Sequence, residues 1–369
     1  MLRKFRIPWA RPILFGDEID LIREAVQSTY ISSGSFIEDF ELQFSQIHGG
    51  SVTALTVNNG TSALQLAFLA LNVAPGDEVI VPGWCFAAAA NMVIACGGTP
   101  VFADIDEKTW LLCPHDVARK ITNKTKAIVA VHTYGNVCDM AALCKIGAEH
   151  NIFVIEDCAE SLFSRYAGQI CGTFGSVACY SFQATKTITC GEGGAVVVPA
   201  GTVEDRMRLI RSHGMTSARK YWHELVGHNF RLTNLQAAML CAQLRHRDEL
   251  IKMHKDLYRR YHARLSAIDG IQLQIFLPQV DPVVWSVALK LPRSRCVPAR
   301  DRVLEKLADA GIESRPGFYA MSQQPIYDAP RLPRSETVAE EVIALPSPPD
   351  LSDDEIDYVC FHFKASIRN

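Results

Sequence analysis

Asp157 and Lys186 are the two side chains whose type and placement point most directly to chemistry. Asp157 follows the apolar run 152–155, which is typical of a short buried strand. Lys186 follows on a loop rich in Ser, Thr and Gly, between the strand-like segments 177–182 and 195–198. A lysine amine can form a Schiff base with an aldehyde cofactor, and a carboxylate can hold a pyridine nitrogen protonated so that the ring accepts electrons. The pair predicts a catalytic pyridoxal 5'-phosphate site, against the alternative of a merely solvated loop lysine.

A second feature is the turn Asn58-Asn59-Gly60-Thr61-Ser62, which precedes the apolar periodic run 63–71. The pattern predicts a strand followed by a helix. Unpaired N–H groups and the positive end of the helix dipole favour an anion at such a helix N-terminus. An ordinary helix cap with nothing bound is the alternative. Because Lys186 predicts a phosphorylated cofactor, we expect its phosphate at this turn.

The surrounding elements alternate between strands and helices, which implies an α/β fold with a mostly parallel sheet covered by helices on both faces. Ligands of such sheets bind beyond the carboxyl ends of the strands. The markers that follow strand ends are the turn 60–62, Trp84, Tyr134, Asp157 and Lys186. The expected strands are 77–82, 100–106, 126–132 and 151–157, and the expected helices are 17–28, 37–48, 87–96 and 140–150. Ile19, Ile22 and Val26 share one face of the first helix.

The last third of the chain changes character. A helix over 235–260 is expected to link two domains. Beyond it, short strands at 271–276 and 285–291 alternate with helices at 300–310 and 353–363. The segment 206–217 is expected to be a polar connector. We therefore expect a large cofactor-binding domain over 1–254, which includes an N-terminal lead-in, and a small α/β domain over 255–369.

Composition narrows the class of protein. The 369 residues are 48% hydrophobic and 21% charged, with a formal net charge of -3. The sequence has no run of Lys or Arg, so we do not expect nucleic-acid binding. It has no uninterrupted apolar run of about 18 residues, so we do not expect a membrane span. The beginning of the chain does not resemble a signal peptide. Twelve cysteines are scattered without zinc spacing, so we expect reduced thiols, no metal and a cytoplasmic location.

The central motifs resemble the DegT family of PLP-dependent sugar aminotransferases. They are Glu156-Asp157-Cys158-Ala159-Glu160, then Ser181-Phe182 with Lys186, then Gly191-Glu192-Gly193-Gly194. The resemblance covers nearly the whole chain and implies the fold-type-I aminotransferase architecture.

The resemblance also implies roles for individual residues. Gly60, Thr61 and Ser62 would cradle the cofactor phosphate, Trp84 would stack on the ring, Glu160 would lie near the pyridoxal O3′, and Ser181 would also bind the cofactor. Asn229 would cross a homodimer interface to the partner's phosphate, so that two active sites are shared. Ser33, Tyr134, Arg315 and Tyr319 would contact substrate. Each has a structural alternative: a core tryptophan for Trp84, a helix-capping loop for Asn229 and a surface ion pair for Arg315.

The implied activity moves an amino group from L-glutamate to a nucleotide-linked 4-keto-6-deoxy sugar. Glu160 and the segment 315–319 favour the GDP-perosamine synthase branch, hence GDP-4-keto-6-deoxymannose and O-antigen lipopolysaccharide biosynthesis. Gly317, Ala320 and Ser322 depart from that pattern where sugar contacts are expected. A UDP- or dTDP-linked substrate and a non-catalytic regulatory protein of the same fold remain alternatives. A related dehydratase is disfavoured because those relatives carry histidine in place of Lys186.

Overall fold

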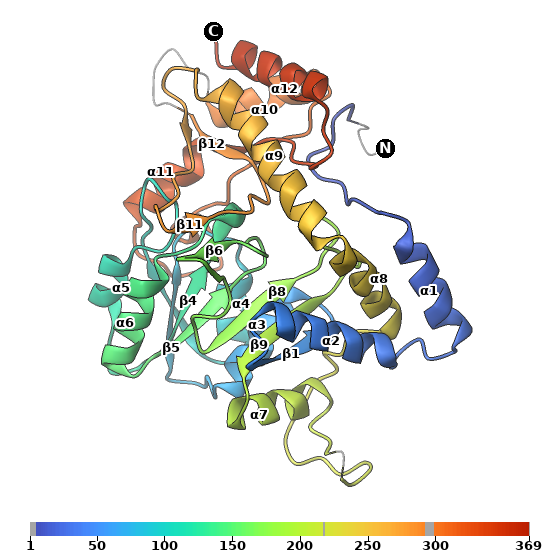
Figure 1. The fold of residues 1–369 in the computed structure, drawn as a ribbon. Helices are drawn as coiled ribbons and strands as arrows, with labels where there is room; N and C mark the ends of the chain where they lie inside the picture. The colour runs from blue at the N-terminus through green and yellow to red at the C-terminus, as the bar shows by residue number, and fades with distance from the viewer. Residues whose placement is uncertain (1–4, 217, 292–298, 369) are drawn as a thin grey trace.

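A seven-stranded sheet occupies the centre of the protein (Figure 1). The computed structural model describes residues 5–216, 218–291 and 299–368. The strand order is β1-β9-β8-β5-β4-β2-β3, and only β9 runs antiparallel to its neighbours. The strands are β1 (Val52–Val57), β2 (Glu78–Pro82), β3 (Thr99–Ala103), β4 (Thr125–Val131), β5 (Phe153–Asp157), β8 (Val177–Ser181) and β9 (Gly194–Pro199). The predicted mostly parallel sheet is confirmed, and its parallel strands end at one edge.

Helices cover both faces of this sheet. One hydrophobic core joins its first face to α1, α2, α5, α6 and α8, and a second core joins the opposite face to α3, α4 and α7. The helices are α1 (Asp17–Gln27), α2 (Ser35–Ile47), α3 (Gly60–Ala70), α4 (Ala88–Ala95), α5 (Pro114–Lys120), α6 (Met140–His150), α7 (Thr202–Arg211) and α8 (Asn234–Arg245). Burial on both faces explains why the central strands read as continuous apolar runs rather than alternating ones.

A smaller α/β part follows α9 (Arg247–Leu265). Its four-stranded sheet has the order β10-β12-β14-β13. A separate three-stranded sheet, in the order β11-β6-β7, pairs β11 with two short strands that precede α9 in the sequence. The strands are β10 (Gln272–Leu273), β12 (Ala288–Lys290), β13 (Arg315–Pro316), β14 (Val342–Ala344), β11 (Val280–Asp281), β6 (Arg165–Tyr166) and β7 (Gln169–Ile170). The helices are α10 (Arg300–Asp309), α11 (Pro333–Glu341) and α12 (Asp353–Ser366), and short 3-10 turns lie at Thr133–Gly135 and Met321–Gln323.

The predicted boundary between 254 and 255 falls inside α9. Leu250 packs in the core of the large part, whereas Leu257, Tyr261 and Leu265 pack in the core of the small part. Ile7 also belongs to the small core, where it pairs with Ile312. The N-terminal segment therefore runs from the small part down to α1 (Figure 1). The division into 1–254 and 255–369 stays a prediction, and this segment does not follow it.

Three local expectations were wrong. The single helix expected over 235–260 is divided at His246 into α8 and α9. The connector expected over 206–217 is helical in its first part, because α7 continues to Arg211. Residue 217 lies outside the described residues. Of the strand expected over 285–291, only β12 forms. Trp285 therefore precedes the sheet.

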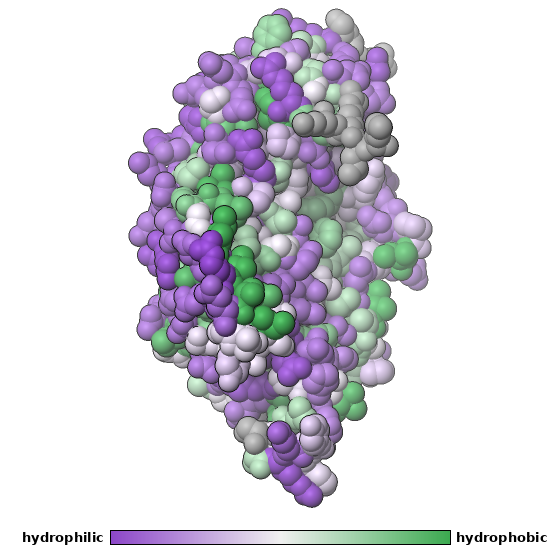
Figure 2. All heavy atoms as spheres, turned by 90° about the vertical axis from the view of Figure 1, so that its right-hand side faces the viewer, coloured by the Kyte–Doolittle hydropathy of each residue, from purple (hydrophilic) through white to green (hydrophobic). Residues whose placement is uncertain are grey.

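The apolar stripe of α1 does not face the core. Leu21 and Ala25 are buried, while Ile19 and Val26 are 64% and 53% exposed. Tyr30 and Ile31, in the following turn, are also exposed. Figure 2, which views the side that carries α1, shows apolar side chains gathered in a strip between hydrophilic ones. These side chains leave apolar surface exposed on this side of the molecule.

Within the described ranges, each cysteine is a free thiol, and Cys296 lies outside those ranges. No described helix combines the length and the apolar character that a membrane crossing needs.

Candidate active site

A cavity of about 690 Å³ opens beyond the carboxyl edge of the central sheet. It lies between that edge and the small part of the protein, whose β13 and following loop form the opposite wall. Most of the predicted residues meet here. Those that line the cavity are Gly60, Thr61, Tyr134, Asp157, Glu160, Ser181, Lys186, Arg315 and Tyr319. Residues from four strand ends and from the C-terminal third thus share one space.

Lys186 lies at the centre of the charged groups. Its side chain is 14% exposed, and its Nζ lies 3.6 Å from Glu160 Oε1. Burial lowers the pKa of Lys186, although the charges of Glu160 and Asp157 act in the opposite direction. Burial likewise raises the pKa of Asp157 and of Glu160, against the attraction of the Lys186 ammonium. A lysine with a lowered pKa keeps a larger fraction of neutral, nucleophilic amine near neutral pH.

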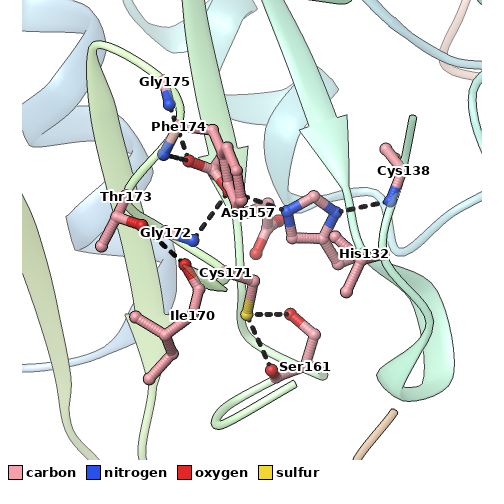
Figure 3. Close-up of polar contacts among 12 residues, drawn as sticks. His132, Cys138, Asp157, Ser161, Ile170, Cys171, Gly172, Thr173, Phe174 and Gly175 are labelled. Atoms are coloured by element: carbon pink, nitrogen blue, oxygen red, sulfur yellow. Dashed lines mark hydrogen bonds and ion pairs between the residues drawn. The ribbon is translucent and has the colours of Figure 1, made fainter. Parts of the chain in front are cut away.

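Glu156, the residue before Asp157, is held at the end of β5 by a buried network of hydrogen bonds. The Glu156 carboxylate is fully buried and accepts hydrogen bonds from the backbone N–H groups of Gly172, Phe174 and Gly175, each 2.7 Å long. His132 Nε2 lies 3.2 Å from the same carboxylate. Figure 3 shows these contacts around the end of β5, with Asp157 beside them. Burial would raise the pKa of Glu156, but the bonds from His132 and these amides hold it below its usual value.

This network also explains an apparent metal site. His132, Glu156 and Cys158 bring three ligand-type atoms within 4.8 Å of one another. However, His132 Nδ1 already accepts a hydrogen bond from the Cys138 N–H, and its Nε2 donates to Glu156. A metal would have to displace these bonds, because a neutral imidazole has only one free lone pair. The cluster therefore tethers loop 171–175 to β5.

The opposite end of the cavity suits a phosphate. α3 begins at Gly60, and the Asn59 side chain accepts the Ser62 N–H at 2.8 Å, so Ser62 is occupied by the cap rather than lining the cavity. Among the described residues, no acceptor contacts the backbone N–H of Gly60 or Thr61. A Cβ at Gly60 would come within 2.8 Å of Ser181 Cβ, so glycine permits this close approach of α3 to β8. The unpaired amides and the helix dipole form a site for an anion.

Tyr134 reaches the cavity through an uncommon backbone conformation. Its φ is 62° and its side chain is buried, which places it in the left-handed region that most side chains avoid. The Tyr134 N–H donates to Glu160 Oε2 at 3.0 Å. Non-glycine residues held in this region cluster at functional sites because the surrounding structure must compensate for their strain.

The prediction for Trp84 is wrong. Trp84 is fully buried outside the cavity, and its indole N–H donates to the Phe318 carbonyl at 2.6 Å. It supports the small part's wall instead of presenting a face to a cofactor ring. Phe86, two residues later, lines the cavity and is 61% exposed. Both aromatics follow β2 in the sequence, and of the two it is Phe86 rather than Trp84 that lines the cavity.

Two further predicted residues lie away from the cavity of their own chain. Ser33 and Asn229 are exposed and do not line it. Asn229 Oδ1 accepts a hydrogen bond from Arg231 Nε at 3.2 Å, and its backbone bridges to Ser212. The segment between α7 and α8 that carries Asn229 projects from the body of the molecule (Figure 1). A role of either residue in a shared site stays a prediction.

The structure adds residues that sequence reasoning missed. Trp285 and Trp9 line the cavity beside Lys186, and their rings meet edge to face at 5.4 Å. Arg315 lies over the Trp9 ring, with its guanidinium carbon 4.9 Å from the ring centre. Trp9 also receives a contact from the small part, since its backbone N–H donates to Glu313. No local pattern marks either tryptophan, because both reach the site through contacts distant in sequence.

The geometry can be compared with known proteins. The model of the DegT/DnrJ/EryC1/StrS aminotransferase family matches residues 13–364. The chain belongs to this family. It is 40% identical over 357 residues to the GDP-perosamine synthase of Escherichia coli O157:H7, with 96% of each chain covered. It is 38% identical to the GDP-perosamine synthase of Caulobacter vibrioides, again with 96% of each chain covered.

Solved structures of the same kind share the fold. A putative sugar aminotransferase of Streptococcus pneumoniae, Spr1654 in its PLP-form, is 26% identical with a TM-score of 0.91, and the match covers 98% of each chain. A 3-amino-5-hydroxybenzoic acid synthase also has a TM-score of 0.91 at 29% identity, covering 98% of this chain and 99% of that one. The predicted family, fold class and aminotransferase activity are confirmed.

Proposed function

We propose that the protein is a pyridoxal phosphate-dependent aminotransferase that moves the amino group of L-glutamate to a nucleotide-linked 4-keto-6-deoxy sugar. One observation carries the proposal. The Lys186 amine is buried with Asp157 and Glu160 in a cavity whose far end offers the free backbone amides of Gly60 and Thr61. An amine, an acid and an anion site that line one cavity fit the aldehyde, pyridine nitrogen and phosphate of the cofactor.

Each residue that lines the cavity has its own role in the proposed reaction. When bound, pyridoxal phosphate supplies the electron sink that lets an amino group leave one carbon and join another. Lys186 would hold the cofactor and, once released, would move a proton between the substrate Cα and the cofactor C4′. Asp157 holds the pyridine nitrogen protonated, while Gly60, Thr61 and Ser181 orient the phosphate. Phe86 covers the ring face in place of Trp84, and Glu160 stays within reach of the Lys186 amine.

The attachment of the cofactor can be tested directly. Borohydride reduction of the purified holoenzyme, followed by peptide mapping, should place the reduced cofactor on Lys186. A Lys186→Ala variant should lose both the label and the visible absorbance of the bound cofactor. A label on another lysine in the wild-type protein would contradict the proposed role of Lys186.

The GDP-linked sugar is the substrate that the relatives favour, since those at 38–40% identity are named GDP-perosamine synthases. Arg315 lies at the cavity wall and its side chain is 55% exposed, while its Nη2 pairs with Glu313 Oε1 at 2.8 Å. The other guanidinium donors are the ones that would contact a diphosphate or carboxylate. Parallel assays with GDP-, UDP- and dTDP-linked 4-keto-6-deoxy sugars, each with L-glutamate, should show a preference for the GDP-linked substrate. A preference for a UDP- or dTDP-linked sugar would transfer the proposal to that alternative.

A homodimer with shared active sites is part of the same proposal. Ile19 and Val26, which are exposed, and Ile22, which is half-buried, offer an apolar surface on α1. A second copy of the chain is the occupant that the predicted role of Asn229 requires. In a two-fold dimer each copy would contribute Asn229 to the partner's phosphate site. Asn229→Ala should weaken cofactor retention by roughly 10- to 100-fold, because one hydrogen bond to a charged phosphate is lost.

Subunit mixing tests this arrangement. Asn229→Ala and Lys186→Ala chains should each be impaired alone. After proven subunit exchange, one site of the mixed dimer carries both substitutions and the other carries neither, so activity should return. Exchange without recovery would show that Asn229 does not act across an interface.

A further inference from the structure

We infer that Trp285 is the positioning residue on whose ring face the Lys186 ammonium rests whenever the amine is not bonded to the cofactor. The inference rests on the proposed role of Lys186. It assigns a function to a residue of the small part that no sequence motif marked.

The contact itself is direct. Lys186 Nζ lies 3.8 Å from the centre of the Trp285 ring, within the range in which the negative face of an indole attracts a cation. The nearest carboxylate oxygen, on Glu160, is 3.6 Å away, which is longer than a good charge-assisted hydrogen bond. The ring therefore supports the ammonium without the directional bond that would hold it against the carboxylate.

Both the side chain and the backbone of Trp285 are held by hydrogen bonds. Its indole N–H donates to the carbonyl of Thr185, the residue before Lys186, and its backbone N–H donates to the Tyr134 carbonyl at 3.1 Å. The side chain is only 7% exposed. The Trp9 ring meets it edge to face, and the Tyr134 ring lies stacked at 6.3 Å. An indole held in this way cannot turn its face from Lys186 without breaking several contacts.

The chemistry of the site gives the contact its use. A released lysine has to remain close to the reacting carbon, and it has to leave its resting place each time it carries a proton. Close salt bridges with two buried carboxylates would favour the charged form strongly and fix its position. A ring face stabilises the ammonium more weakly and without a fixed direction. The ring contact should therefore hold Lys186 partly charged and still mobile.

A purely structural role for Trp285 predicts something different. If the indole only anchored the Thr185 loop, its removal would change stability and activity but not the proton affinity of the Lys186 amine. The test therefore measures that proton affinity. Full-length protein converted to its pyridoxamine phosphate form with L-glutamate has Lys186 free, and the pH dependence of Lys186 acetylation, followed by mass spectrometry, reports the midpoint of its titration.

Trp285→Leu should lower that midpoint by about one pH unit, because the attraction that favours the ammonium is lost while the site stays apolar. Trp285→Phe keeps a ring face and loses the indole N–H, so its midpoint should stay close to that of the wild-type protein. Trp110→Leu is the matched control. Trp110 is also a fully buried tryptophan but does not line the cavity, so its substitution should leave the midpoint unchanged.

Ring-fluorinated tryptophan keeps the test decisive if Trp285→Leu does not fold. Fluorination weakens the negative ring face with little change in shape, and Trp285 is the tryptophan whose ring contacts Lys186 in the described part of the chain. The midpoint should fall further with each added fluorine. Equal midpoints in the fluorinated and ordinary proteins, or in folded Trp285→Leu and wild type, would overturn the inference. Borohydride labelling of Lys186 in the same proteins, carried out on the pyridoxal phosphate form before L-glutamate is added, separates this failure from a failure of the proposed function.

Discussion

The two walls of the cavity have different origins. One wall is built from the ends of parallel strands, where Asp157, Ser181 and the start of α3 come together through sheet hydrogen bonding. The other is built from Trp9, Trp285 and the segment 315–319, which meet through packing between distant parts of the chain. The first wall holds the groups that cofactor chemistry needs. The second wall differs in composition, being rich in aromatic and small residues.

This difference indicates a division of labour. A sheet edge fixes the relative positions of its groups rigidly, as chemistry on one cofactor requires. A wall made of loops and side-chain packing can change without disturbing that chemistry, so it is the natural place for substrate selection. The predictions below test whether the two walls separate in this way.

Removing Lys186 should have the largest effect. Lys186→Ala removes both the attachment point and the proton carrier of the strand-end wall, so turnover should fall by roughly 10⁴-fold or more. The measurement is turnover of keto sugar with saturating L-glutamate. Added methylamine, which can replace a missing amine, should recover part of the rate. Retention of more than a hundredth of the wild-type rate would place the key amine elsewhere.

Acidification should lower the free energy of unfolding through a histidine that packs α9 against Val284. His254 is buried on α9 beside Val284, and burial lowers its pKa to about 4, although its bond to the Val284 carbonyl acts in the opposite direction. As the pH falls below 6.5, His254 is therefore protonated in the unfolded chain before it is protonated in the folded protein. Stability is present above that pH and is lost toward pH 4, by up to about 3 kcal/mol for this one group.

The His254 contribution can be isolated by a variant that keeps a donor for the Val284 carbonyl. Denaturant unfolding of His254→Asn at pH 7 and pH 4.5 should show a smaller loss of stability than the wild-type protein shows. His48→Asn, on the large part, should reduce the loss in the same way, because burial lowers the pKa of His48 to about 4 as well. An unchanged pH dependence in both variants would assign the acid sensitivity to other groups.

Arg315 should separate the substrates. Arg315→Gln removes a charged donor from the packed wall, and the KM for the nucleotide-linked sugar should rise by roughly 10- to 100-fold. Single-turnover reaction of the cofactor-loaded enzyme with L-glutamate should change much less. If the glutamate half-reaction slows equally, Arg315 binds a carboxylate common to that step and the proposed division between the walls is incorrect.

Phe86 and Trp84 give the smallest expected effect and test the correction to the sequence prediction. Phe86→Leu should raise the dissociation constant of pyridoxal phosphate by about 10-fold, since it removes an aromatic face from the cavity. Trp84→Phe should leave that constant nearly unchanged, because its lost contact is with the Phe318 carbonyl. The opposite ranking, measured by fluorescence titration of the two apoproteins, would restore the stacking role to Trp84.

The sequence predicted the sheet and its edge because the relevant signals are local. An apolar run followed by Asp157, and a helix start after Asn59, can be recognised without knowing the rest of the fold. Trp285 could not be assigned in this way. It reads as part of a strand, yet it leaves the sheet before β12 because its indole N–H bonds to the Thr185 carbonyl. Tertiary packing also reversed the apparent inner face of α1, whose buried side chains are Leu21 and Ala25.

The N-terminal segment has a consequence for synthesis of the protein. Ile7 pairs with Ile312 in the small core, and its N–H donates to the Gly311 carbonyl at 3.1 Å. On a ribosome the residues around Ile7 emerge early, whereas their partners emerge only after the central sheet has been made. Trp9 follows Ile7 and therefore cannot take its place beside Trp285 until that late docking. A segment that is made before the central sheet is thus among the last to reach its native position, and the cavity wall is completed only then.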